Sequence, residues 1–122
     1  DMALKTCGLW FSRAAIGMGV HDAIHARMSA IKPDGYIGAC AAISGTDFYT
    51  PTSGLRLPTL GIAGSEDRFT PPDLIRETVD LIPGAQFKLM RRAGHLPMVD
   101  QADEFAEVLS GFIEDTGHLR KL

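Results

Sequence analysis

Two residues that could move a proton, Asp67 and His95, each follow an apolar stretch of the chain. Asp67 lies in the turn after residues 57–64, and His95 lies in the turn after residues 86–91. If both stretches are strands of one parallel unit, their carboxyl ends meet at one sheet edge, and the two side chains become neighbours. A carboxylate bonded to one imidazole nitrogen leaves the other free to take a proton from a hydroxyl or thiol. The spacing therefore predicts an acid–base pair that activates a nucleophile.

The other acidic residues near this pair have simpler interpretations. Glu66 is a competing acid, but it is one residue away and should point elsewhere if Asp67 points at the imidazole. Asp73 and Asp100 fit helix caps. Asp67 alone could cap its own turn, so the combination with His95 is what favours catalysis.

No residue matches the nucleophile that such a pair requires. The available hydroxyls are Ser53, within Thr52-Ser53-Gly54, and Ser65, beside the acid. Neither follows a strand and opens a helix, as a nucleophile elbow does. We therefore expect the nucleophile and the oxyanion hole on a segment absent from this chain, and we expect the chain alone to be inactive.

The elements that must position the pair follow a strand–helix–strand pattern. Residues 57–64 form a short, continuous apolar run flanked by Pro and Gly, which is typical of a parallel strand covered on both faces. The sequence then predicts a helix over 71–82, capped by Thr70, and a strand over 86–91. A final helix over 102–114 carries apolar residues on one face and needs a sheet to cover.

The first 49 residues carry helical signals and little strand signal. We predict two or three short helices there, with breaks at residues 17–19 and 44–45. Residues 1–49 thus form a helical cap or lid, and residues 50–122 form the core. The tail from residue 116 has no apolar pattern, so we expect it to fray.

Metal and disulfide chemistry have weak support in the sequence. His21 and His25 are spaced like two zinc ligands on a helix, but the second residue of that motif should be Glu, and a third ligand is required. We interpret both as solvent-facing or capping residues. Cys7 and Cys40 are interpreted as free thiols, and no cofactor is indicated.

The composition is that of one globular domain in the cytoplasm. The 122 residues are 45% apolar and 22% charged, with a net charge of −3 spread along the chain. This balance argues against a nucleic-acid or membrane surface. No apolar run approaches the ~18 residues of a membrane span. The N-terminus is not a signal peptide, and Asp before Met indicates a start inside a longer chain.

Four segments around the pair resemble the C-terminal third of the α/β-hydrolase superfamily. The matching segments are residues 57–67, 70–72, 82–85 and 94–97. In that family the loop with the acid (here residues 65–70, the acid loop) follows the penultimate strand, and the loop with the histidine (here residues 93–95, the histidine loop) follows the last strand. The resemblance implies an α/β fold: the C-terminal portion of an α/β hydrolase, with its last two parallel strands, flanking helices and a small helical cap. It also implies that Asp67 orients His95, which acts as general base and then general acid for a serine.

The cap carries a narrower resemblance. Trp10-Phe11 and residues 33–43 resemble the cap of 3-oxoadipate enol-lactonases, hydrolases of the β-ketoadipate pathway of aromatic catabolism. This implies a small acidic enol-lactone as substrate, whose carboxylate could pair with Arg13, Arg27 or Arg68.

Two alternatives remain open. Another acyl hydrolase, such as a carboxylesterase or perhydrolase, would share the pair and differ in its pocket. A non-catalytic interaction module derived from a hydrolase is the other. Because two strands cannot cover helices on both faces, we expect exposed apolar surface and association with the missing N-terminal half of the fold or with a second copy.

Overall fold

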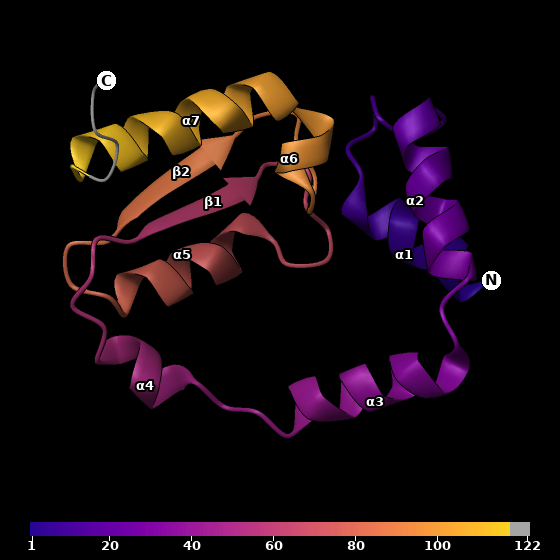
Figure 1. Cartoon of the computed structure of the whole chain (residues 1–122), viewed down its shortest axis with the longest axis horizontal. Helices are drawn as coiled ribbons and strands as arrows, with labels where there is room; N and C mark the ends of the chain where they lie inside the picture. The colour runs from indigo at the N-terminus through magenta and orange to yellow at the C-terminus, as the bar shows by residue number, and fades with distance from the viewer. Residues whose placement is uncertain (118–122) are drawn as a thin grey trace.

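The computed structural model describes residues 1–117, and most of the tail for which we predicted fraying lies outside them. The elements follow one another as α1 (Met2–Trp10), α2 (Gly19–Ser29), α3 (Pro33–Ser44), α4 (Tyr49–Ser53), β1 (Leu60–Gly64), α5 (Pro72–Asp80), β2 (Gln86–Met90), α6 (Pro97–Asp100) and α7 (Ala102–Asp115). Figure 1 shows α5 and α7 on opposite faces of the two strands, with α1 and α2 beyond one end of the sheet.

The two strands form the parallel pair that the sequence predicted. β1 and β2 run in register from Leu60 opposite Gln86 to Gly64 opposite Met90, and α5 connects them. β1 begins three residues later than the apolar run, because residues 57–59 form a bend followed by irregular chain. The strand–helix–strand unit and the helices on both of its faces are those that the sequence predicted. Because the strands are parallel, the loops that follow β1 and β2 lie at the same edge of the sheet, beyond the carboxyl ends of the strands.

Glycines bring these elements into close contact. A Cβ on Gly61 would lie 2.2 Å from Cγ2 of Val79, so α5 packs directly on β1 at this point. At the end of β1, a Cβ on Gly64 would lie 2.1 Å from the carbonyl oxygen of Gly94 and 2.4 Å from that of Ala93. The backbone N–H of Glu66 donates to the Ala93 carbonyl at 2.8 Å. The acid loop and the histidine loop are thus joined through their main chains.

A cluster of buried apolar residues lies at α1, α2 and the segment between them and consists of Ala3, Cys7, Phe11, Ala15 and Met28. α1 ends at Trp10 because Phe11 is extended, so the helical signal up to residue 17 overestimated its length. The ring of His21 packs 5.2 Å from that of Phe11 and the residue is 9% exposed, and α2 begins without a side-chain cap. The prediction that His21 faces solvent or caps a helix was therefore wrong.

The free-thiol interpretation of the cysteines is confirmed. Cys7 is buried, Cys40 is exposed, and neither is in a disulfide. Burial raises the pKa of the Cys7 thiol. Within residues 1–117, no cluster of three or more His, Cys, Asp or Glu side chains could hold a metal ion. None of the helices in the same residues is long and apolar enough to cross a bilayer.

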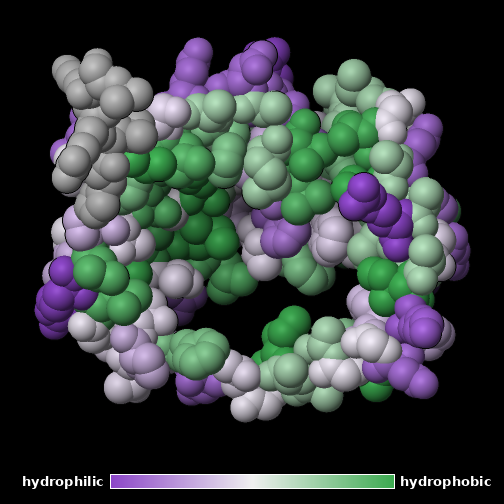
Figure 2. Space-filling view, viewed as in Figure 1, coloured by the Kyte–Doolittle hydropathy of each residue, from purple (hydrophilic) through white to green (hydrophobic). Residues whose placement is uncertain are grey.

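Large apolar faces remain uncovered, as the two-stranded sheet predicted. Neither α3 nor α7 contains a buried residue. A groove of about 260 Å³ separates α7 from the strands and includes Leu60, Phe87, Val108 and Phe112 in its lining. Figure 2 shows apolar side chains gathered where α7 crosses the sheet, and open space between α3 and the sheet.

Replacing Gly64 by Ala should destabilise the protein, because the new Cβ must displace the main chain of the histidine loop. We expect a loss of ~1–3 kcal/mol in the free energy of unfolding, measured by urea titration. Gly111→Ala is the matched control, since a Cβ at Gly111 meets nothing within 4 Å and Ala is favoured in a helix by about 1 kcal/mol. Equal effects of the two substitutions would show that the loops are not in close contact.

Candidate active site

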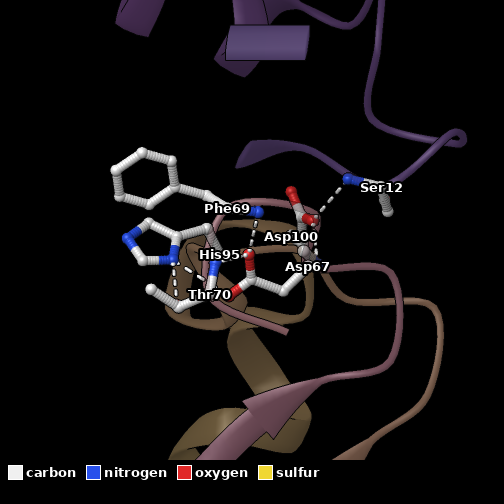
Figure 3. Close-up of polar contacts among 7 residues, drawn as sticks. Ser12, Asp67, Phe69, Thr70, His95 and Asp100 are labelled. Atoms are coloured by element: carbon white, nitrogen blue, oxygen red, sulfur yellow. Dashed lines mark hydrogen bonds and ion pairs between the residues drawn. The ribbon is translucent and has the colours of Figure 1, made fainter. Parts of the chain in front are cut away.

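Asp67 and His95 meet at the sheet edge, as their spacing predicted. Oδ2 of Asp67 lies 2.9 Å from Nδ1 of His95 (Figure 3). The Asp67 side chain is 5% exposed and that of His95 is 26% exposed. Because an ionised carboxylate can only accept, the proton between them belongs to Nδ1. Nε2 therefore carries the lone pair and can accept a proton.

Four donors surround the Asp67 carboxylate. Oδ1 accepts the backbone N–H groups of Phe69 and Thr70 at 2.8 and 2.9 Å, and Oδ2 accepts the Thr70 hydroxyl at 3.0 Å as well as His95. Burial acts to raise the pKa of Asp67, but these hydrogen bonds, led by the one from His95, outweigh it and hold the pKa below its usual value. The carboxylate is therefore fixed in its ionised form.

Thr70 is a site residue that sequence reasoning missed. We predicted it as a helix cap, but α5 begins at Pro72 after Pro71, without a side-chain cap. The Thr70 hydroxyl instead lies 3.0 Å from Nδ1 of His95 and from Oδ2 of Asp67. A signal existed, because an Asp that binds the N–H groups two and three residues ahead places the third residue beside its carboxylate. Since Thr70 contacts Nδ1, it is not placed to act as a nucleophile toward Nε2.

Two aromatic rings flank the imidazole. The centroid of Phe69 lies 5.0 Å from that of His95 in an edge-on arrangement, and Trp10 lies 5.5 Å away at a tilt of 34°. Phe69 comes from the acid loop and Trp10 from the end of α1. Together with the hydrogen bond to Asp67, these rings restrict the orientation of the His95 side chain.

The two serines that we considered have other partners. Ser65 accepts the backbone N–H of Arg92 at 3.0 Å, which ties the acid loop to the end of β2. Ser53 donates to the carbonyl of Thr50 within α4. In residues 1–117, no hydroxyl or thiol makes a hydrogen bond to Nε2 of His95.

The remaining charged candidates lie away from the imidazole contact. Glu66, Arg13 and Arg68 line a pocket of about 190 Å³ together with Phe11. Arg68 donates from its guanidinium to the carbonyl of Gly8 at the end of α1. The carboxylate of Glu66 lies in the same pocket as Arg13. Because this negative charge would repel a substrate carboxylate, the pocket gives little support to these arginines as its binding site. Arg27 lies on α2.

The predicted helix-capping roles of Asp73 and Asp100 are wrong. Asp73 lies in the first turn of α5, where an acid suits the helix dipole, but it makes no capping hydrogen bond. Asp100 ends α6, and α7 begins without a side-chain cap. The Asp100 carboxylate instead accepts the backbone N–H groups of Gly94 and Ser12.

Proteins that are similar to this chain include an ester hydrolase and enol-lactonases. The chain is 35% identical over 71 residues to a pimeloyl-(acyl-carrier protein) methyl ester esterase of Stenotrophomonas maltophilia, covering 58% of this chain and 27% of the esterase. It is 32% identical to 3-oxoadipate enol-lactonase 1 of Acinetobacter baylyi, covering 66% and 30%. The crystal structure of the enol-lactonase from Burkholderia xenovorans LB400 superposes with a TM-score of 0.86 at 25% identity, covering 93% and 44%. No family model matches the chain.

Two parallel strands, helices on both faces, and an Asp and a His on successive loops at one edge agree with the fold of these similar proteins. The chain has the fold of the C-terminal part of an α/β hydrolase and is similar in sequence to the two hydrolases above. It spans less than half the length of each of the three proteins above.

The contribution of Asp67 to stability should disappear in acid. Its folded-state pKa lies below the unfolded value of about 3.9, so the stabilisation is complete above that value and is lost as the pH falls through the folded-state pKa. Between about pH 7 and pH 3, the free energy of unfolding of the wild type should therefore fall more than that of Asp67→Asn. Asp103→Asn removes an exposed carboxylate and should follow the wild type. Parallel curves for the wild type and Asp67→Asn would contradict the pKa direction.

Proposed function

We propose that this chain supplies the acid–base pair of a serine-type α/β hydrolase that cleaves a small ester or lactone. The observation that carries the proposal is the 2.9 Å hydrogen bond from Nδ1 of His95 to a buried, ionised Asp67, which leaves Nε2 available. The esterase and lactonase names of similar proteins support the same chemistry.

In this mechanism His95 carries one proton through the reaction. Nε2 removes the proton of a serine hydroxyl while the serine oxygen forms a bond to the carbonyl carbon of the substrate. The positive imidazolium is stabilised by Asp67, which keeps Nδ1–H in place. His95 then gives the proton to the leaving oxygen as the ester bond breaks. Water attacks the acyl-enzyme in the same way, and the serine recovers its proton.

The nucleophile in this proposal is a serine outside residues 1–117. Two observations support this placement: no hydroxyl or thiol in those residues bonds to Nε2, and neither α3 nor α7 contains a fully buried residue. The similar proteins are more than twice as long as the matched segments. A further part of the hydrolase fold would cover these helices and bring the serine to His95. In this arrangement residues 1–49 form the cap and residues 50–122 belong to the core.

For the substrate, we propose the enol-lactone of 3-oxoadipate. The 32% identity to the Acinetobacter enol-lactonase and the TM-score of 0.86 to the Burkholderia enol-lactonase support this substrate. The cap resemblance at Trp10-Phe11 adds support, since Trp10 packs beside His95. A methyl ester is the second candidate, because methyl ester esterases match at the higher identity of 35% and, in Xanthomonas oryzae, over 92% of the chain at 28% identity.

Loss of either member of the pair should abolish turnover in the complete polypeptide. His95→Ala removes the proton acceptor, and Asp67→Asn lets the wrong imidazole nitrogen carry the proton, so kcat should fall on the order of 10⁴-fold in each case. Glu66→Gln is the matched control and should leave kcat within about threefold. A larger loss in Glu66→Gln than in Asp67→Asn would mean that the acid is misassigned.

The substrate assignment is tested by comparing kcat/KM for 3-oxoadipate enol-lactone, a methyl ester of a dicarboxylic acid and a simple aryl ester. We expect the enol-lactone to be preferred by ~100-fold or more, because a pocket built for one acyl group discriminates by several kcal/mol. A preference for the methyl ester would favour the esterase. Folded protein that cleaves none of the three would favour a non-catalytic module.

A further inference from the structure

The carboxylate of Asp100 joins the histidine loop to the cap. Its Oδ2 accepts the backbone N–H of Gly94 at 2.8 Å and the backbone N–H of Ser12 at 3.0 Å (Figure 3). Gly94 directly precedes His95, and Ser12 follows the end of α1. A single oxygen atom therefore holds two segments that are distant in sequence, one of which carries the imidazole.

The main chains of these two segments are in direct contact. A Cβ on Gly94 would lie 2.0 Å from the carbonyl oxygen of Trp10 and 2.9 Å from the nitrogen of Ser12. The backbone N–H of His95 donates to that same Trp10 carbonyl. Both peptide N–H groups around the start of the loop, at Gly94 and at His95, are thus bound, the first by Asp100 and the second by the cap.

The surroundings of Asp100 indicate that this contact is its main role. The side chain caps neither α6 nor α7, and its Oδ1 is buried without a hydrogen-bond partner among residues 1–117. Burying a carboxylate oxygen without a partner is unfavourable. In the described structure, the two charge-assisted hydrogen bonds that Oδ2 accepts offset this cost. One comes from the histidine loop and the other from the cap.

We propose that Asp100 is a positioning residue that fixes the position and orientation of His95 relative to the cap. The proposal rests on the proposed role of His95 as general base. Without the carboxylate, the N–H groups of Gly94 and Ser12 lose their shared acceptor and the loop can shift away from the cap. A shift of the imidazole by ~1 Å is enough to lower turnover about 100-fold.

The test uses the complete polypeptide with Asp100→Ala, Asp100→Asn and the control Asp103→Asn, which removes an exposed carboxylate three residues further on. Two quantities are measured in folded protein: the split between kcat and KM, and the downfield proton resonance of His95 Nδ1–H bonded to Asp67. In Asp100→Ala we expect kcat to fall about 10- to 100-fold with KM changed less than ~3-fold, and the resonance to shift or broaden. Asp100→Asn keeps an acceptor oxygen, so it should recover part of kcat and of the resonance.

The outcomes separate this proposal from the proposed function. Asp100→Ala with wild-type kcat and an unchanged resonance would overturn the positioning role, as would Asp100→Asn that is as impaired as Asp100→Ala. If Asp100→Ala does not fold, the comparison of Asp100→Asn with Asp103→Asn decides: equal spectra and rates overturn the proposal. If the wild type cleaves no ester or lactone, the proposed function fails, while the resonance still reports whether Asp100 holds His95 in place.

Discussion

The site depends on direct main-chain contact between three segments that no side chain larger than hydrogen would permit. Gly64 at the end of β1 lies against the carbonyl of Gly94, and Gly94 lies against the carbonyl of Trp10. The acid loop, the histidine loop and the end of α1 are therefore stacked at the distance of backbone hydrogen bonds. This stacking lets the short side chains of Asp67 and His95 reach each other. It also makes the cap part of the wall of the site.

The last carbonyl groups of α1 accept hydrogen bonds from the loops that carry Asp67 and His95. The last carbonyls of a helix have no partner within it and carry partial negative charge. Here the carbonyls of Gly8, Leu9 and Trp10 accept from Arg68, through its side chain and its backbone, and from the backbone of His95. The acid loop and the histidine loop thus bind the same helix terminus, so the cap and the acid–base pair are placed by one set of contacts.

Much of the core could be predicted from the sequence because local patterns determine it. The apolar run, the Pro-started helix and the second strand form one crossover unit, and parallel pairing then brings Asp67 and His95 to one edge. The predictions failed where a polar side chain has a tertiary partner. Thr70 and Asp100 both stand before helices and fit the pattern of a cap, yet each bonds to a different loop. Sequence spacing gives no signal for a partner such as Ser12, 88 residues away.

All the hydrogen bonds that hold Asp67 and His95 together come from the two loops after β1 and β2. Every donor to Asp67 comes from its own loop or from His95, so the carboxylate is ionised and oriented by the two-strand unit alone. Nε2, in contrast, points to no donor in the described residues. Neither α3 nor α7 contains a fully buried residue. A strand paired with the free edge of β1 and parallel to it would end at the rim where His95 lies, because the carboxyl ends of parallel strands share one edge of a sheet.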